Sequence, residues 1–358
     1  MKNIYFTTGP TQLNDKVKSY FYSAIRKNIL SFSHRSKDFS DILQSTVEEL
    51  KKLLEIPDSH YVFFLSSGTE CMERIIQNLV YKKSFHFING YFAERFYNIS
   101  KQLKKSPKFI KTDFGKGFDF GEIKIPDETE LICITHNETS TGVALNLDDI
   151  YEIKKSHKNK LVALDIVTSV PYYRIDFEYI DSAFFSVQKG FGMPSGLGVL
   201  IINKKCLKKT KDLNKKNINI GTYNNFLNLK LNADKNQTTV TPNILGIYLL
   251  GRICKQLNEY GIDKIRNETE VKAKLIYNFL DGIDKYNAFV SDETLRSKTT
   301  IVVESKKEID KVILKLSRKN IIVNNGYKDF KNKHFRIGNF PMHKIENAIR
   351  LVNILEYL

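Results

Sequence analysis

Short apolar runs, each followed by polar or small residues, recur along the first 202 residues of this chain. Each run holds few polar side chains, which predicts buried parallel strands that are covered on both faces. Helical patterns lie between some of them: Met72, Ile75, Ile76 and Leu79 share one helix face, and 148–156 favours a second short helix. The expected strands are residues 61–65, 131–135, 161–164, 182–185 and 198–202. Strands that alternate with helices predict an α/β domain with a mostly parallel sheet.

The pattern changes in the last third of the chain. Residues 242–260 predict a long helix with Gly261 as its C-cap, and 268–280 predict a further helix. Beyond them we expect the order strand, helix, strand, strand, helix. These elements are expected at 299–304, 308–316, 321–324, 334–337 and 344–358. This order suits a smaller C-terminal α+β domain.

The length of 358 residues is enough for about two domains, each with a core of its own. We predict a large domain over residues 1–255, which includes an N-terminal arm at 1–15. The small domain is predicted over residues 256–358.

Charge and cysteine usage argue against several classes of function. The net charge of +16 favours anionic partners. We expect no nucleic-acid binding, because the sequence has neither an RNA-binding signature nor a helix-turn-helix pattern. The four cysteines are scattered without metal-ligand spacing, so we expect no metal site. No run approaches a membrane helix and residues 1–6 lack signal-peptide architecture, which predicts a cytoplasmic protein without a membrane partner.

Polar residues follow the expected strands, where open α/β sheets bind their ligands. Residues 66–70, Ser-Ser-Gly-Thr-Glu, stand before a predicted helix. The N–H groups and dipole of such a helix favour a bound anion such as phosphate. An ordinary helix cap at Ser67 or Thr69 would explain the same residues. Residues 136–142 form a polar loop whose side chains can reach a ligand.

Two ionisable residues follow the next two strands. Asp165 ends an apolar run, where a carboxylate is costly unless a cationic ring nitrogen, a salt bridge or a helix terminus pairs with it. Lys189 follows Gln188 and precedes Gly190; it is either a turn lysine or an amine in a desolvated pocket. A desolvated amine can lose its proton near neutral pH and attack a carbonyl, such as the aldehyde of pyridoxal phosphate (PLP). The order of anion cradle, carboxylate and lysine favours this second interpretation.

With these motifs the chain resembles the class V aminotransferases of fold-type I, and among them most of all the phosphoserine aminotransferases. The matching residues occur in the family's order at 6–10, 33–36, 66–69, 137–143, Asp165, 185–190 and 335–337. The resemblance implies a PLP-binding large domain, built on a mostly parallel sheet flanked by helices, and a smaller C-terminal α+β domain.

The resemblance also implies roles for single residues at the cofactor. Lys189 would bind the cofactor covalently and move the substrate proton, and Asp165 would keep the ring nitrogen protonated. Phe92 would stack on the ring, where the family usually has Trp. The phosphate and the ring hydroxyl region would contact Gly68, Thr69, Gln188 and Thr139. Thr241 would reach the cofactor of a second subunit, which implies a homodimer; the family's usual Asn beside it is Val240 here.

At the substrate, Arg336 would form a bidentate pair with the α-carboxylate. The distal anion would lie near Thr8, His34, Arg35 and Lys328. The family's late His-Arg pair is Tyr327-Lys328 in this chain.

The implied activity is a ping-pong transamination between O-phosphoserine and 2-oxoglutarate, a step of serine biosynthesis. The alternatives are an alanine–glyoxylate or aminoethylphosphonate aminotransferase and, more remotely, a non-catalytic protein that kept the fold. The joint presence of Lys189, Asp165, Gln188 and Arg336 argues against the last. A cysteine desulfurase would need a cysteine in the C-terminal part, and none follows Cys254.

Overall fold

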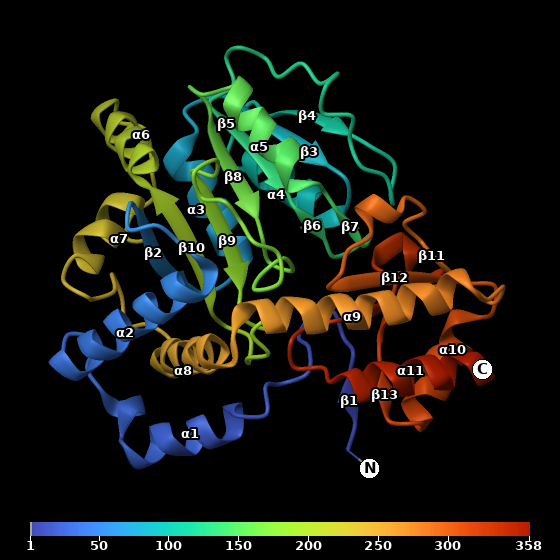
Figure 1. Cartoon of the computed structure of the whole chain (residues 1–358). Coiled ribbons are helices and arrows are strands. Elements are labelled where there is room, and N and C mark those ends of the chain that lie inside the picture. Colours follow the sequence, from blue (N-terminus) through green and yellow to red (C-terminus); the bar gives the residue numbers. More distant parts are fainter. Residues whose placement is uncertain (1) are drawn as a thin grey trace.

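The computed structural model describes residues 2–358, which form a seven-stranded sheet between helices and a smaller four-stranded sheet beside it (Figure 1). The large sheet has the strand order β2-β10-β9-β8-β5-β3-β4. Its strands are β2 (His60–Leu65), β3 (Ser84–Ile88), β4 (Lys108–Lys111), β5 (Leu131–Thr135), β8 (Leu161–Asp165), β9 (Ser182–Ser186) and β10 (Gly198–Asn203). The predicted α/β domain is therefore confirmed.

One strand of this sheet departs from the prediction. β10 runs antiparallel to both of its neighbours, whereas the other adjacent pairs are parallel. The expectation that residues 198–202 form a parallel strand was wrong. Residues 187–197 connect β9 to β10 without a helix, and so short a connection returns the chain antiparallel.

Two strands of the large sheet, β3 and β4, were not predicted from the sequence. β3 is fully buried but contains Ser84 and His86, whose side chains pair through an Oγ···Nε2 contact of 2.9 Å. β4 is a largely exposed edge strand with a lysine at each end. Neither strand therefore presents a continuous apolar run.

Alternate residues of each strand face opposite layers, as period-2 geometry requires. In β2, for example, Val62 packs with one helical layer and Phe63 with the other. The layer that contains Phe63 is built from α3 (Gly68–Leu79), α4 (Tyr91–Gln102), α6 (Lys204–Lys215) and α7 (Phe226–Ala233). The opposite layer is built from α1 (Val17–Arg26), α2 (Lys37–Leu54), α5 (Leu147–Ser156) and α8 (Ile244–Tyr260). No helix within residues 2–358 is long and apolar enough to cross a bilayer.

The C-terminal part has the predicted order of elements around a third core, preceded by one strand, β11, that was not predicted. Its antiparallel sheet consists of β11 (Tyr286–Ala288), β12 (Thr300–Ser305), β15 (His334–Gly338) and β14 (Asn324–Asn325). Its helices are α9 (Ile262–Asp281), α10 (Ile309–Arg318) and α11 (Ile345–Tyr357). The short remaining elements are β6 (Asn137–Glu138), β7 (Val143–Ala144), η1 (Ile29–Ser31), η2 (Glu293–Leu295) and η3 (Lys328–Phe330).

The first residues of the chain join this C-terminal core. β1 (Ile4–Tyr5) pairs in parallel with β13 (Ile321–Ile322), and the blue and red segments lie side by side in Figure 1. Phe6 is fully buried in the same cluster. The division of the chain at residue 256 stays a prediction, and the small unit would include this N-terminal strand.

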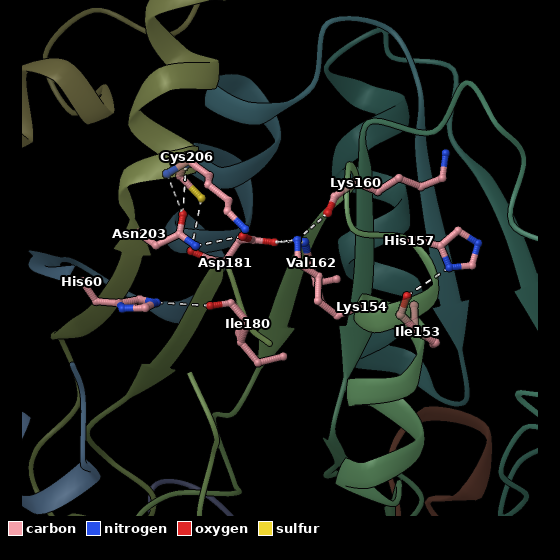
Figure 2. A network of polar contacts seen from close by, with 11 residues as sticks. His60, Ile153, Lys154, His157, Lys160, Val162, Ile180, Asp181, Asn203 and Cys206 are labelled. Atoms are coloured by element: carbon pink, nitrogen blue, oxygen red, sulfur yellow. Dashed lines mark hydrogen bonds and ion pairs between the residues drawn. The ribbon is translucent and has the colours of Figure 1, made fainter. Parts of the chain in front are cut away.

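A buried ion pair ties one end of the large sheet together (Figure 2). Lys154 Nζ, from α5, donates to Asp181 Oδ2 at 2.6 Å, and the two side chains are only 7% and 2% exposed. The backbone N–H of Val162 and the amide of Asn203 also donate to the Asp181 carboxylate, at 2.9 and 2.8 Å. Asp181 precedes β9, so this network lies at the end of the strand opposite to Lys189.

Candidate active site

A cavity opens where β5, β8 and β9 end and α3 begins. This is the place at which the sequence predicted ligand binding, because the carboxyl ends of parallel strands meet at one edge of the sheet. Phe92, on α4, lines the cavity as well. The other predicted cofactor residues that line it are Gly68, Thr69, Thr139, Asp165, Gln188 and Lys189.

Lys189 lies buried in this cavity, held by the N-terminal arm. Its Nζ donates to the carbonyl of Thr8 at 2.6 Å. Burial, together with the positive charge of Arg336, lowers the pKa of Lys189 to about 8. The arm passes so close that a Cβ on Gly9, at φ +140°, would stand 2.1 Å from Nζ. Glycine at this position therefore allows the Lys189 amine, part of which is neutral and nucleophilic at neutral pH, to lie next to the backbone.

Asp165 is the last residue of β8 and only 4% exposed. Its Oδ1 accepts the N–H of Val167 at 2.9 Å, and no cation within residues 2–358 pairs with it as a salt bridge. Burial raises its pKa to about 7. A buried carboxylate without a cationic partner is suited to a ligand that supplies one, such as a protonated ring nitrogen.

The N-terminus of α3, the predicted anion cradle, lies at the cavity. The Ser67 hydroxyl caps the helix by accepting the N–H of Glu70 at 3.1 Å, so the cap interpretation holds as well. Gly68 N donates to Ser186 Oγ at 2.8 Å, and a Cβ at Gly68 would stand 2.9 Å from that oxygen. The tight packing aims the first turn and the Thr69 hydroxyl at the cavity, where the helix dipole favours an anion.

Three polar atoms on the cavity wall are buried without a hydrogen-bond partner: Thr135 Oγ1, Asn137 Oδ1 and Gln188 Oε1. Buried polar atoms are satisfied in nearly all cases, so a group of them marks the place of a polar ligand. Together with the amine, the carboxylate and the cradle, they fit the aldehyde, ring and phosphate of PLP.

Arg336, on β15, reaches the same region from the small sheet. It is 8% exposed, its Nε donates to the carbonyl of Asn325 at 3.0 Å, and its Nη1 donates to that of Thr139 at 3.4 Å. Burial lowers its pKa to about 10, which leaves it cationic at neutral pH. No carboxylate within residues 2–358 forms a salt bridge with it, so its charge is available to a substrate carboxylate.

Six predicted residues do not line the cavity of their own chain. Two of them, Thr8 and Arg336, contact the lining residues Lys189 and Thr139. The other four are His34, Arg35, Thr241 and Lys328. Thr241 Oγ1 lies 3.3 Å from His34 Nδ1, and Arg35 donates to Asn232 and Gln237 at 3.0 and 2.7 Å. These three residues form a separate group, and Thr241 lines a different hollow. The fourth is Lys328, whose Nζ lies 4.5 Å from the centre of the Tyr91 ring.

Two residues that line the cavity, Arg95 and Tyr327, were not among the predicted site residues. Arg95 stands three positions after Phe92 on α4, so both share one helix face. A helical interpretation of residues 91–102 would have predicted this position. Tyr327 precedes Lys328 and was noted only for the family residue that it replaces.

The sheet, the buried lysine and the unpaired carboxylate together define a PLP-dependent enzyme of fold-type I. The chain belongs to the family described as aminotransferase class-V, whose model matches residues 5–336. It is an aminotransferase, and its cofactor is pyridoxal phosphate.

Individual relatives resemble the chain over almost its whole length. A phosphoserine aminotransferase of Rhodococcus opacus is 25% identical over 99% of this chain and 94% of its own. The crystal structure of a phosphoserine aminotransferase from Cytophaga hutchinsonii is 41% identical, with a TM-score of 0.97, over 99% of this chain and 98% of the other. A PLP-bound phosphoserine aminotransferase from Trichomonas vaginalis is 17% identical, with a TM-score of 0.81 over 99% and 100% of the two chains, and shows the fold alone.

Proposed function

We propose that this chain transfers the amino group of O-phosphoserine to 2-oxoglutarate, or the reverse, in serine biosynthesis. The observation that carries the proposal is the 41% identity to the Cytophaga hutchinsonii phosphoserine aminotransferase over 99% of this chain. The alanine–glyoxylate aminotransferase of Nostoc is 19% identical and supports only the shared fold.

The residues of the chain support each requirement of transamination. PLP, when bound, supplies an electron sink for the substrate carbanion. Lys189 is placed to accept the substrate Cα proton at Nζ, because burial brings its pKa to about 8. Asp165, on the cavity wall, is placed to keep the ring nitrogen cationic. Arg336, which donates to the carbonyl of the lining residue Thr139, is placed to orient the α-carboxylate.

A half-reaction screen tests the substrate. Cofactor-loaded protein is mixed in turn with phosphoserine, alanine, serine and aminoethylphosphonate, without an acceptor, and the absorbance of the Lys189-bound cofactor is followed. Phosphoserine should convert the cofactor fastest. A faster reaction with alanine or aminoethylphosphonate would assign the chain to another class V activity. Lys189→Ala serves as the control and should lack both the absorbance and turnover.

We further propose that the active enzyme is a homodimer with shared active sites. His34, Arg35 and Thr241 support this, because they form a group of their own and would act on the cavity of a second subunit. Exposed apolar side chains near α1 also support it, since a second copy could cover them. They are Leu13, Phe21, Tyr22, Ile25 and Leu30. A cytoplasmic location stays a prediction.

Mixed dimers test the shared site. Lys189→Ala and Arg35→Ala variants are each assayed alone and then after subunit exchange. If Arg35 serves the neighbouring subunit, a mixed dimer regains one intact site, and the statistical mixture recovers about one quarter of wild-type activity. Recovery at the level of the arithmetic mean of the two variants would show that Arg35 serves its own chain or neither.

A further inference from the structure

We propose that Arg95, positioned by Tyr327, binds the distal anionic group of the substrate in the cavity that holds Lys189. The inference deepens the proposed function and rests on the chain acting on an amino acid with two anionic ends. Such an anion would be a phosphate or a second carboxylate.

Arg95 lies on the cavity wall beside the position proposed for the cofactor ring. It stands on α4, and its guanidinium carbon is 5.1 Å from the centre of the Phe92 ring. Its side chain is half-buried, which strengthens its interaction with a ligand relative to an exposed cation.

The charge of Arg95 has no anionic partner in the described chain. No carboxylate of residues 2–358 forms a salt bridge with it, whereas Arg74, on the neighbouring helix, is paired with Glu73. Its hydrogen bonds go to two neutral hydroxyls, Thr69 Oγ1 at 3.4 Å and Tyr327 Oη at 3.2 Å. A guanidinium has five N–H donors, so most of them remain available to a ligand.

Tyr327 connects Arg95 to the second cation of the site. The Tyr327 ring lies against Phe92 at 5.2 Å between centres, and the Arg336 guanidinium carbon is 5.4 Å from the same ring. One guanidinium therefore lies against the ring and the other at its hydroxyl. A substrate whose α-carboxylate is bound at Arg336 would extend along Tyr327 and present its distal anion to Arg95. The Arg95 guanidinium can bind such an anion through two N–H groups at once. The Lys328 ammonium cannot, and it lies over the Tyr91 ring instead.

Arg95 also contacts Thr69 of the anion cradle, so its other possible target is the cofactor phosphate. The two roles differ in what they discriminate. A ligand of the cofactor phosphate would affect every substrate equally, whereas a ligand of the distal anion would affect only ligands that carry one.

Binding of non-reacting acids to the cofactor-loaded protein separates the two roles. Calorimetry with 3-phosphoglycerate, malate and lactate compares a distal phosphate, a distal carboxylate and no distal anion. Arg95→Gln should weaken 3-phosphoglycerate or malate binding about 10- to 100-fold and leave lactate within about twofold, since one charged hydrogen-bonding group is lost. Arg95→Lys should keep part of the affinity, and Tyr327→Phe should cause a smaller loss in the same direction. The control is Lys101→Gln, because Lys101 is an exposed cation over Tyr97 on the same helix.

Equal losses for all three acids would overturn the inference, and so would weaker cofactor binding by Arg95→Gln with unchanged discrimination among the acids. Wild-type protein that binds 3-phosphoglycerate and malate no tighter than lactate would overturn it as well. The proposed phosphoserine activity can fail separately. A protein that converts aspartate but not phosphoserine, and in which Arg95→Gln weakens malate alone, would refute the substrate and retain the role of Arg95.

Discussion

The lowered pKa of Lys189 predicts how fast the cofactor-free protein captures PLP at each pH. Only the neutral amine attacks the aldehyde, so the capture rate follows the deprotonated fraction. With the pKa at about 8, roughly one Lys189 in eleven is neutral at pH 7, against about one in 3000 at the ordinary value of 10.5. The lowered pKa thus raises the reactive fraction at pH 7 roughly 300-fold. Because this pKa is lowered, the rate should rise with pH through about 8 and level off above about 9.

Stopped-flow mixing of PLP with cofactor-free protein, followed by the absorbance of the bound cofactor, measures this profile. Arg336→Met removes a positive charge that lowers the pKa of Lys189, so its profile should shift to higher pH. No amino acid is present, so the loss of the α-carboxylate ligand does not affect the measurement. Arg74→Met is the control, because Arg74 is paired with Glu73 and lies outside the cavity. A rate that keeps rising to pH 10.5 in the wild type would refute the reasoning.

Three further perturbations follow from described contacts. Lys154→Met leaves the Asp181 carboxylate buried without its cation and should lower the free energy of unfolding in urea by about 3–5 kcal/mol. The exposed neighbour Lys155, replaced in the same way, should cost below about 1 kcal/mol, and equal losses would contradict the argument. Gly9→Ala places a methyl group 2.1 Å from Lys189 Nζ, so PLP capture at pH 9 should be at least about tenfold slower. An unchanged rate would show that the N-terminal arm moves aside without hindering the amine. Asp165→Asn can still accept the backbone N–H of Val167 but loses the negative charge. PLP should therefore bind about 10- to 100-fold more weakly in an absorbance titration. Equal affinity would show that Asp165 does not pair with the ring nitrogen.

Asp165 and Lys189 were predictable from sequence for a physical reason. Each follows an apolar run that only a covered strand explains, and an ionisable side chain in such a place needs a function or a partner. The strand ends also predicted the cradle at Gly68 and Thr69, which lines the same cavity. Local patterning carries this information because a strand's direction determines which residue emerges at the ligand-binding edge.

The remainder depends on contacts that local patterning does not encode. The strand that contains His86 was missed because Ser84 and His86 interrupt its apolar pattern, and their contact with each other forms only in the folded sheet. A helical interpretation of residues 91–102 would have placed Arg95 beside Phe92, but its contact with Tyr327, 232 positions later in the chain, exists only in the folded structure. His34 and Thr241 contact each other within the chain. Whether they also serve the site of a second subunit depends on how subunits assemble, which local patterning does not encode.

The pairing of β1 with β13 affects the order in which a growing chain can complete this site. Thr8, whose carbonyl holds the Lys189 amine, donates its backbone N–H to Asn324 Oδ1 at 2.7 Å. The strand before Thr8 finds its partner only at Ile321–Ile322. During synthesis the first residues must therefore wait, unpaired, until nearly the whole polypeptide has left the ribosome. The sheet and its lysine can form earlier, but the arm that positions the amine is docked among the last events of folding.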